Sequence, residues 1–487
     1  MIHRLKPVRS AVLTLMSMLV FPSGISFAEE PELQRKVVLT DIEADPDDTQ
    51  SLVRLLLYAN QIDIEAIVAT TSVHQKDRVA PESIHKVLDA YGKVQANLLL
   101  HEPGFPTVED LKAKVTEHLP LYGMEGVGED KDSPGSDRII ELLDSDDERP
   151  LWISVWGGPN TLAQSLFKLR KTRSAEELEK LVSKLRVYTI SDQDDSAIWI
   201  RNEFPGVSYI VSPGSYRRST WGAINQRIDG IDNTTISNKW IADNIQQSHG
   251  PLGAQYPDVA WGVEGDTPAF LGLLPNGLNV PERPDFGGWG GRYELSQPTD
   301  EEIKVGQDVE GVPIKAETRK IWTNTEDSYA PRIFKEYGRA EKPDEQTFTN
   351  NRVTLWRWRD DFQNDFAARM DWTIKDVAGA NHPPVPALAH PEKFTVEPGE
   401  KFRLDAGGTT DPDGDSLGFT WMQYPEAGSS PRVKVDFKNF PENVYQVNRV
   451  APKVSRTETM HFILKVTDKG SPPLTRYKRV IVTVEPN

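Results

Sequence analysis

The sequence contains no cysteine. This absence excludes disulfide bonds, a cysteine nucleophile, thiolate metal ligands and a lipid anchor attached through cysteine. Any metal ion would have to be bound by oxygen or imidazole ligands. The chain has 487 residues, more than the length over which a single hydrophobic core keeps growing, so two or more domains are expected.

Long apolar runs are also missing. After the first residues, no stretch approaches the roughly 20 apolar residues that a membrane-spanning helix needs, so no membrane anchor is expected. At the start, three basic residues precede a short apolar run over residues 11–20, and Ser26 and Ala28 are small. This pattern predicts a secretory signal peptide over residues 1–28 with cleavage near Ala28, and hence a secreted or periplasmic protein.

Basic residues are in the minority. The chain has 56 Lys and Arg against 73 Asp and Glu, a formal net charge of -17 at pH 7. Such an acidic protein repels phosphate backbones, and no basic cluster with interleaved aromatic residues is found. Nucleic acid is therefore not an expected partner.

Residues 29–380 alternate between strand and helix patterns. Short β-branched runs at residues 36–40, 64–71, 151–156 and 185–190 alternate with segments of helical periodicity. This order predicts an α/β domain with a mostly parallel sheet and flanking helices. Because ligands of such sheets bind at the carboxyl ends of the strands, the residues just after each strand are the candidates for function.

The pattern of polar and apolar residues changes at about residue 381. A proline-rich linker over residues 382–386 leads into short segments of alternating polarity without helical period. Residues 381–487 are therefore predicted to form an all-β immunoglobulin-like sandwich. The segment from Leu404 resembles cadherin-like and polycystic-kidney-disease-type sandwiches. Its acidic run Asp411–Asp415 is expected to form a hairpin turn, with a calcium loop as the alternative. Trp421 and Tyr424 could fill the core or contact polysaccharide.

An acidic turn directly after the first strand is the strongest functional signal. Five of eight residues carry carboxylates, in the order Asp41, Glu43, Asp45, Asp47 and Asp48. Crowded carboxylates raise one another's pKa or recruit a cation, and Ca²⁺ prefers such oxygen ligands. Capping of the following helix explains one or two acidic residues but not five. The turn therefore predicts a metal site.

The motif D-I-E-A-D-P-D-D resembles the D-x-D-P-x-x-D-D turn of inosine-uridine-type nucleoside hydrolases, with Glu43 in place of the central aspartate. Two later segments resemble that family in the right order. W-G-G-P-N-T-L contains Thr161, and E-G-D-T-P contains Asp266. Together with a C-terminal sandwich, the sequence is similar to the bacterial family of cellulose-binding proteins with a nucleoside hydrolase-like domain.

The resemblance implies a metal site and its ligands. It implies Ca²⁺ bound by Glu43, Asp48, Asp266 and the Thr161 carbonyl, with Glu43 also the candidate base. Because glutamate is longer than aspartate, Asp41 or Asp45 is the alternative for one of these roles.

The resemblance also implies sugar contacts. Asp47 and Gln75 stand where the family contacts sugar hydroxyls. Gly265 stands where some members of the family have a histidine that acts as the general acid. Because this chain lacks that histidine, Asp192 is the candidate for the general acid. Asp194 and Asp195 are candidate substrate contacts, or else part of an acidic loop that caps the next helix.

Two further features remain open in function. The glycine-rich turn at residues 285–293 contains Trp289 and Arg292, which suit stacking on a sugar and binding its hydroxyls. It could equally be a structural loop over the sheet. His74 follows a strand and is either a proton donor or a structural histidine.

These observations predict a secreted glycosyl hydrolase of the nucleoside hydrolase superfamily, in which water attacks an anomeric carbon with metal assistance. The substrate would be a nucleoside or another glycoside, with plant or algal polysaccharide as one source. The alternative is a carbohydrate-binding protein without catalysis. An acid and a base facing one anomeric carbon would distinguish the two.

Overall fold

A computed structural model describes residues 32–212, 216, 218–299, 302–303, 312, 315–331, 346–429 and 444–486. The expected signal peptide, residues 1–28, lies outside this range. Among the described residues, no helix has the length and apolar character needed to span a bilayer.

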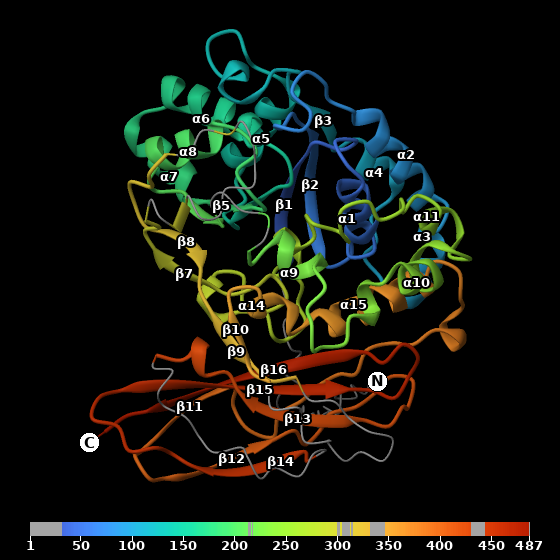
Figure 1. Ribbon diagram of the computed structural model, residues 1–487, viewed down its shortest axis with the longest axis vertical. Coiled ribbons are helices and arrows are strands. Elements are labelled where there is room, and N and C mark those ends of the chain that lie inside the picture. Colours follow the sequence, from blue (N-terminus) through green and yellow to red (C-terminus); the bar gives the residue numbers. More distant parts are fainter. Residues whose placement is uncertain are drawn as a thin grey trace, which may run out of the picture. The chain divides into compact units, whose positions relative to one another are not determined.

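An eight-stranded sheet forms the centre of the α/β region, with strand order β3-β2-β1-β4-β5-β6-β8-β7 (Figure 1). Neighbouring strands are parallel except for the pair β7 and β8. This confirms the expected fold class. The strands are β1 (Gln34–Thr40), β2 (Ile62–Ala69), β3 (Val115–Glu117), β4 (Leu151–Val155), β5 (Leu185–Thr189), β6 (Ser208–Val211), β7 (Tyr293–Ser296) and β8 (Ile321–Asn324).

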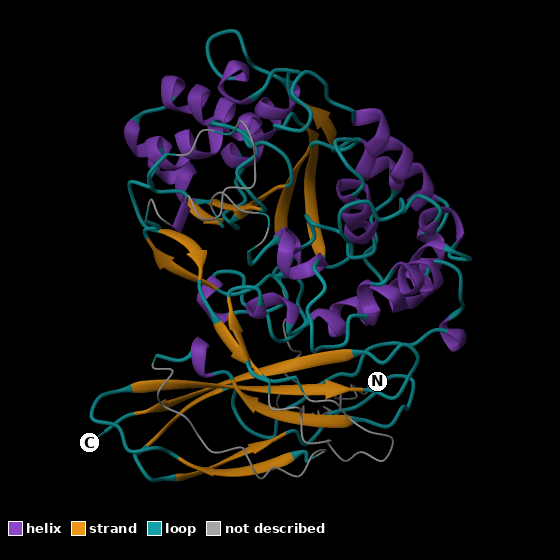
Figure 2. Ribbon diagram, in the orientation of Figure 1, coloured by secondary structure: helices purple, strands orange, loops and turns teal. Residues whose placement is uncertain are grey.

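Helices flank the sheet, as Figure 2 shows. They are α1 (Asp47–Leu56), α2 (Pro81–Gly92), α3 (Gln95–His101), α4 (Val108–Lys112), α5 (Pro134–Asp144), α6 (Asn160–Thr172), α7 (Ala175–Ser183), α8 (Ser196–Glu203), α9 (Trp221–Asn225), α10 (Asn238–Ile241), α11 (Gly250–Gly253), α12 (Pro268–Leu271), α14 (Val353–Trp356) and α15 (Arg359–Asp371).

Both faces of the sheet are buried. On β1, Val38 belongs to an apolar cluster with α1, α2 and α15, whereas Val37 and Leu39 belong to a second cluster with α5 and α6. A strand covered on both faces needs apolar residues at successive positions, which explains the continuous V-V-L run.

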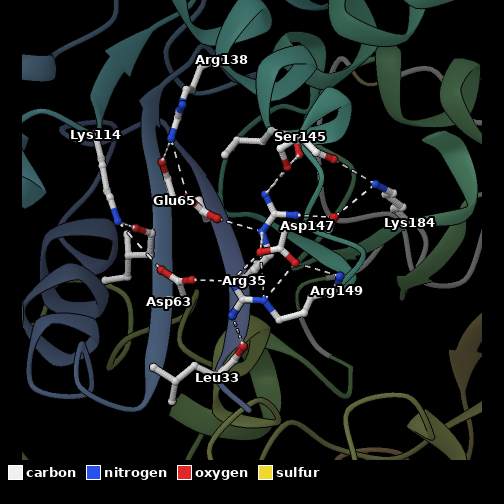
Figure 3. Close-up of polar contacts among 12 residues, drawn as sticks. Leu33, Arg35, Asp63, Glu65, Lys114, Arg138, Ser145, Asp147, Arg149 and Lys184 are labelled. Atoms are coloured by element: carbon white, nitrogen blue, oxygen red, sulfur yellow. Dashed lines mark hydrogen bonds and ion pairs between the residues drawn. The ribbon is translucent and has the colours of Figure 1, made fainter. Parts of the chain in front are cut away.

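Ion pairs close the amino-terminal end of the sheet (Figure 3). Arg35 of β1 is buried and pairs with Glu65 at 2.8 Å and Asp147 at 3.3 Å. Arg149 pairs with Asp147 at 2.6 Å and Asp63 at 2.9 Å. These contacts pair the charges at the end of the sheet opposite to Asp41.

Lys36, the third residue of β1, is fully buried. Its amine contacts the Ser154 hydroxyl and lies 5.5 Å from the centroid of the Phe270 ring. Burial lowers the pKa of Lys36 well below its ordinary value of 10.5. The folded protein therefore holds this lysine at a cost in free energy.

Replacing Lys36 by Met is expected to raise the free energy of unfolding at pH 7 by roughly 1–3 kcal/mol, the typical cost of a poorly satisfied buried polar group. A lysine with a lowered folded-state pKa takes up a proton on unfolding, so its penalty is present at neutral pH. The gain should therefore shrink as pH rises toward 10.5. Urea unfolding at pH 7 and 10 measures it. The exposed Lys401→Met is the control, and an equal gain there would contradict the explanation.

The C-terminal region is all-β. One sheet has the order β11-β16-β15-β13 and a second pairs β12 with β14. The strands are β11 (Lys393–Val396), β12 (Lys401–Asp405), β13 (Gly418–Gln423), β14 (Gln446–Val450), β15 (Glu458–Thr467) and β16 (Thr475–Val484). Trp421 and Tyr424 are buried, so they fill the interior and are not exposed to polysaccharide. Two sheets are compatible with the expected immunoglobulin-like sandwich, which stays a prediction.

The C-terminal region packs on the α/β region, and Leu33–Asn487 forms one compact unit. The Arg479 guanidinium donates to the carbonyls of Leu278 and Gly287 at 2.8 Å each, and the Tyr477 hydroxyl bonds to Asp361. β9 (Asp327–Tyr329) pairs antiparallel with β10 (Phe348–Asn350), and both precede α14 in the sequence. The boundary expected at residues 380 and 381 stays a prediction.

Candidate active site

A cavity of about 410 Å³ lies where the central strands end. Its wall includes residues that directly follow β1 and β4, together with Ile190 just after β5. Five aspartates line it, namely Asp41, Asp45, Asp47, Asp48 and Asp266. Asp41 and Asp45 come from the turn between β1 and α1, Asp47 and Asp48 are the first residues of α1, and Asp266 comes from the segment before α12. The acidic turn and Asp266 thus meet in one cavity, as the sequence predicts.

Few donors serve these carboxylates. The Asp47 amide donates to Asp45 Oδ1 at 3.0 Å, and the Thr40 hydroxyl donates to Asp48. The Trp221 indole N–H donates to Asp47 Oδ2 at 2.9 Å. None of these donors carries a full positive charge, so the negative charge of the cavity is not neutralised by them.

The carboxylates therefore disfavour each other's ionisation. Burial and then neighbouring carboxylates raise the pKa of Asp48 and Asp266 well above the ordinary aspartate value. Burial is also the main cause that raises the pKa of Asp41 and Asp47. Asp266 Oδ2 is buried and has no hydrogen-bond partner in the described structure. A cation in the cavity would offset the repulsion between the carboxylates and would give Asp266 Oδ2 a partner.

The carboxylates present fit such a cation. Asp45, Asp47 and Asp48 each offer an oxygen, and these oxygens lie within 4.8 Å of one another. In the part of the chain that the structure describes, this is the one group of three or more acidic or histidine residues so arranged. Carboxylate oxygens are the ligands that Ca²⁺ prefers, so the set suits the ion that the nucleoside hydrolase resemblance implies.

Glu43 does not join this set, contrary to its expected role as metal ligand and base. Its carboxylate pairs with Arg78 Nη2 at 2.6 Å and accepts a hydrogen bond from the Ser83 hydroxyl. Its side chain is 37% exposed, its φ is 79°, and it does not line the cavity. The backbone turn at Glu43 directs the longer side chain outward, and Asp45 is the nearby carboxylate inside the cavity.

Thr161, expected to give a carbonyl ligand, lies in the first turn of α6 and does not line the cavity. Its carbonyl accepts the Ser165 hydroxyl at 3.0 Å, and its own hydroxyl donates to Thr70 at 3.3 Å. The carbonyl is already engaged within the helix, so the structure gives no support to the expected ligand role.

The acidic loop after β5 makes mostly structural contacts, while the buried Asp194 Oδ2 has no hydrogen-bond partner in the described structure. Asp192 accepts two hydrogen bonds from Arg201 at 2.9 and 2.7 Å. Asp194 accepts the Ser196 amide and hydroxyl at the start of α8, and burial raises its pKa to about 7. Asp195 accepts the Met124 amide at 2.8 Å. None of the three lines the cavity, contrary to the expected catalytic and substrate roles.

The remaining expected contacts are also structural. Gln75 donates its side-chain amide to the carbonyls of Asp41 and Ile42 at 3.3 and 3.2 Å, which holds the acidic turn in place. Trp289 is 1% exposed and donates to the Tyr477 hydroxyl at 3.3 Å. Arg292 is buried and pairs with Asp327 at 2.7 Å. The glycine-rich turn is therefore the structural loop of the two alternatives, and not a sugar platform.

An aromatic wall faces the carboxylates and was not predicted. Trp221 contacts Asp47 directly, and Trp261 lines the cavity while 79% exposed. His74 Nε2 and the Tyr216 hydroxyl lie 2.9 Å apart in the same cavity. Gln193 also lines it. Of these residues, only His74 could be identified as a candidate from the sequence, because it follows a strand.

Gly265 explains how Trp221 reaches Asp47. A Cβ atom at Gly265 would lie 1.9 Å from Trp221 Cδ1 and 2.3 Å from Asp47 Oδ2. The space next to Asp266 is therefore filled by the indole, and any side chain at residue 265 would displace it. The histidine found here in some nucleoside hydrolases has no room in this chain.

Gly265→Ala should destabilise the protein by roughly 1–3 kcal/mol, as overpacking of a filled site typically does. Tryptophan fluorescence should change in the folded state, because Trp221 must move. Urea unfolding and emission spectra measure both effects. Gly418→Ala is the matched control, since its Cβ would meet no atom closer than 3.4 Å. Equal effects in the two variants would argue against the crowding.

The parallel sheet and the acidic cavity at its carboxyl end define a nucleoside hydrolase-like protein. A family model described as "Cellulose-binding Sde182, nucleoside hydrolase-like domain" matches residues 35–293. A second, "Cellulose-binding protein Sde0182, C-terminal domain", matches residues 401–484. The chain therefore belongs to the family that these two models describe.

A solved structure agrees with this assignment. A nucleoside hydrolase-related hypothetical protein from Saccharophagus degradans, described as associated with carbohydrate metabolism, is 35% identical with a TM-score of 0.75. The alignment covers 93% of this chain and all of that one. The effector protein XOO4466 is 11% identical over 71% of this chain and 95% of its own, with a TM-score of 0.30. No curated protein matches significantly.

Proposed function

We propose that the cavity binds a sugar ring with a divalent cation and that the protein hydrolyses a glycosidic bond there. The observation that carries the proposal is the set of five aspartates, including the unpartnered Asp266 Oδ2, opposite an aromatic wall. The family description "cellulose-binding" and the carbohydrate metabolism named for the Saccharophagus protein support a carbohydrate ligand.

Asp45, Asp48 and Asp266 would hold Ca²⁺, with Asp47 beside them. A bound Ca²⁺ would coordinate sugar hydroxyls and lower the pKa of a water molecule. Asp45 takes the place expected for Glu43, because it lies inside the cavity with the other carboxylates. Asp45 and Asp48 belong to the group whose oxygens lie within 4.8 Å of one another, and Asp266 lines the same cavity.

Asp41 and Asp47 are the candidate bases. Burial raises the pKa of both carboxyl groups above the ordinary aspartate value, which makes each a better proton acceptor once ionised. Trp221 fixes the orientation of Asp47 through its indole N–H. A carboxylate held in this way accepts a proton from water without having to reorient.

His74 and Tyr216 are the candidate source of the proton for the leaving group. They lie in the same cavity and share a hydrogen bond of 2.9 Å. Asp192 is excluded from that role in this geometry, since Arg201 engages both of its carboxylate oxygens. Trp221 and Trp261 offer faces on which a pyranose ring can stack.

The second candidate function is carbohydrate binding without catalysis. It is favoured by one observation, the absence of an acid next to Asp266, where Gly265 leaves room only for Trp221. In this case the same cation and aromatic wall would bind sugar hydroxyls, and no bond would break.

The two functions are separated by incubating the protein with cello-oligosaccharides and with nucleosides in Ca²⁺, then measuring reducing-sugar release. The hydrolase predicts release by the wild type and a loss of roughly 100-fold or more in Asp41→Asn or in His74→Ala, in line with removal of a general acid or base. The binding protein predicts saturable binding without release. If the protein neither released sugar nor bound these ligands, both functions would be refuted.

A further inference from the structure

A second pair of carboxylates lacks partners in the all-β region. Asp411 lies in the acidic turn between β12 and β13, and Asp468 directly follows β15. Each has one buried oxygen, Oδ2, without a hydrogen-bond partner in the described structure. This pair belongs to a different region from the cavity of Asp266.

Asp468 is fully buried, at 0% exposure. Its Oδ1 atom accepts three hydrogen bonds, from the Asn381 side-chain amide at 3.1 Å and from the backbone amides of Gly470 and Leu474 at 3.0 and 2.9 Å. All three donors serve the same oxygen. Oδ2 is thus a desolvated acceptor, which is costly unless a positive group satisfies it.

Asp411 repeats this arrangement. Its Oδ1 atom accepts the backbone amides of Asp413 and Asp415 at 3.0 and 2.9 Å, so the turn wraps around one oxygen. Its Oδ2 atom is buried and has no partner in the described structure. The two residues therefore present the same kind of bare oxygen.

A chain of hydrogen bonds links the two carboxylates. The Asn381 side-chain amide donates to Asp468 Oδ1 at 3.1 Å, and the backbone amide of the next residue, His382, donates to Asp413 at 2.7 Å. The Asp413 amide in turn donates to Asp411 Oδ1 at 3.0 Å. Two bare carboxylate oxygens held by one such network are ligands that a hard cation prefers.

We propose that Asp411 and Asp468 bind a second divalent cation, Ca²⁺, through their Oδ2 atoms, with backbone carbonyls and water completing the shell. The ion would join three segments. These are the chain entering the all-β region at Asn381, the turn at Asp411–Asp415 and the turn after β15. The inference does not depend on the proposed function.

The ion would also stiffen the approach to the α/β region. Asp413, in the same turn as Asp411, accepts the His382 amide at 2.7 Å, and the Asn381 carbonyl accepts the Trp372 indole N–H at 2.9 Å. Trp372 directly follows α15 of the α/β region. A cation at Asp411 and Asp468 would therefore hold the segment that connects the two regions.

Calorimetric titration of the full chain with Ca²⁺ tests the proposal. We expect the wild type to bind two ions, Asp468→Asn to lose one and Asp266→Asn to lose the other. Unchanged binding in Asp468→Asn would overturn the second site. Unchanged binding in Asp266→Asn would instead count against the metal in the cavity, so the two failures are distinguishable.

Thermal unfolding separates a metal ligand from a structural residue. Asparagine keeps the Oδ1 acceptor of Asp468 and removes the charge, so Asp468→Asn should be at least as stable as the wild type in EDTA. Saturating Ca²⁺ should raise the wild-type midpoint by about 3 °C or more above that of the variant, since an ion that binds only the folded state stabilises it. Equal loss of stability with and without Ca²⁺ would mean a structural role only.

Discussion

Asp266→Asn is expected to weaken Ca²⁺ binding in the cavity by at least about 100-fold, because even partners of metal ligands are typically worth 10–100-fold in affinity. The Asp266 carboxylate contributes a buried oxygen without any partner, and its pKa is raised by burial and by Asp47 and Asp48. Asparagine keeps the shape and removes the charge. Calcium titration measures the loss, and any sugar release should fall with it.

Glu43→Gln is the matched control for that prediction. Glu43 sits in the same turn but pairs with Arg78 in solvent, so its loss should change the Ca²⁺ affinity by less than about fivefold, the most that an exposed ion pair usually contributes. If Glu43→Gln lost as much Ca²⁺ affinity as Asp266→Asn, Glu43 would be a metal ligand after all. That result would contradict the ligand role proposed for Asp45.

Ca²⁺ affinity should also rise with pH. The pKa values of Asp48 and Asp266 are raised, so these groups hold protons at a pH where ordinary aspartates are ionised. Metal binding must displace those protons, and it becomes easier as they are lost.

Arg54→Met should lower the free energy of unfolding by roughly 3–5 kcal/mol, the usual result of leaving a buried charge without its partner. Arg54 Nη1 pairs with Glu264 Oε2 at 2.6 Å, and both side chains are fully buried. Arg54 also donates to the Phe362 carbonyl at 2.8 Å and to Gln363 at 2.7 Å. Among the described ion pairs, Arg54 is the one partner of Glu264, and the variant removes it.

The double variant Arg54→Met with Glu264→Gln separates the lost charge balance from lost packing. Removing the second charge should recover a large part of the stability, measured by urea unfolding. Glu264 lies two residues before Asp266, so the single variant should also bind Ca²⁺ more weakly. If the double variant were as unstable as the sum of both single variants, the coupling between the two charges would be disproved.

Much of the fold was predictable, because local pattern and topology agree. The apolar run at residues 36–40 falls within β1, and the later strands follow in the predicted order with helices between them. The position of Asp41 and Asp48 could be foreseen for a related reason, because both follow the carboxyl end of β1. Asp266 lies between α11 and α12 and follows no strand directly, so its position could be expected only from the nucleoside hydrolase resemblance.

The details of the site depended on contacts that the local sequence does not encode. Glu43 points away because Arg78 and Ser83, which are far along the chain, offer it partners. Asp192 is taken up by Arg201. Trp221 lies in the cavity because residue 265 has no side chain, a long-range steric effect. Motif spacing identified the acids but not the groups that face them.

The most direct test of the metal site is anomalous diffraction from a crystal soaked in Tb³⁺ as a substitute for Ca²⁺. The predicted result is a strong anomalous peak among the carboxylates of Asp45, Asp48 and Asp266, with Glu43 still paired to Arg78. No peak in that cavity under saturating Tb³⁺, or a peak coordinated by Glu43 instead, would contradict the account.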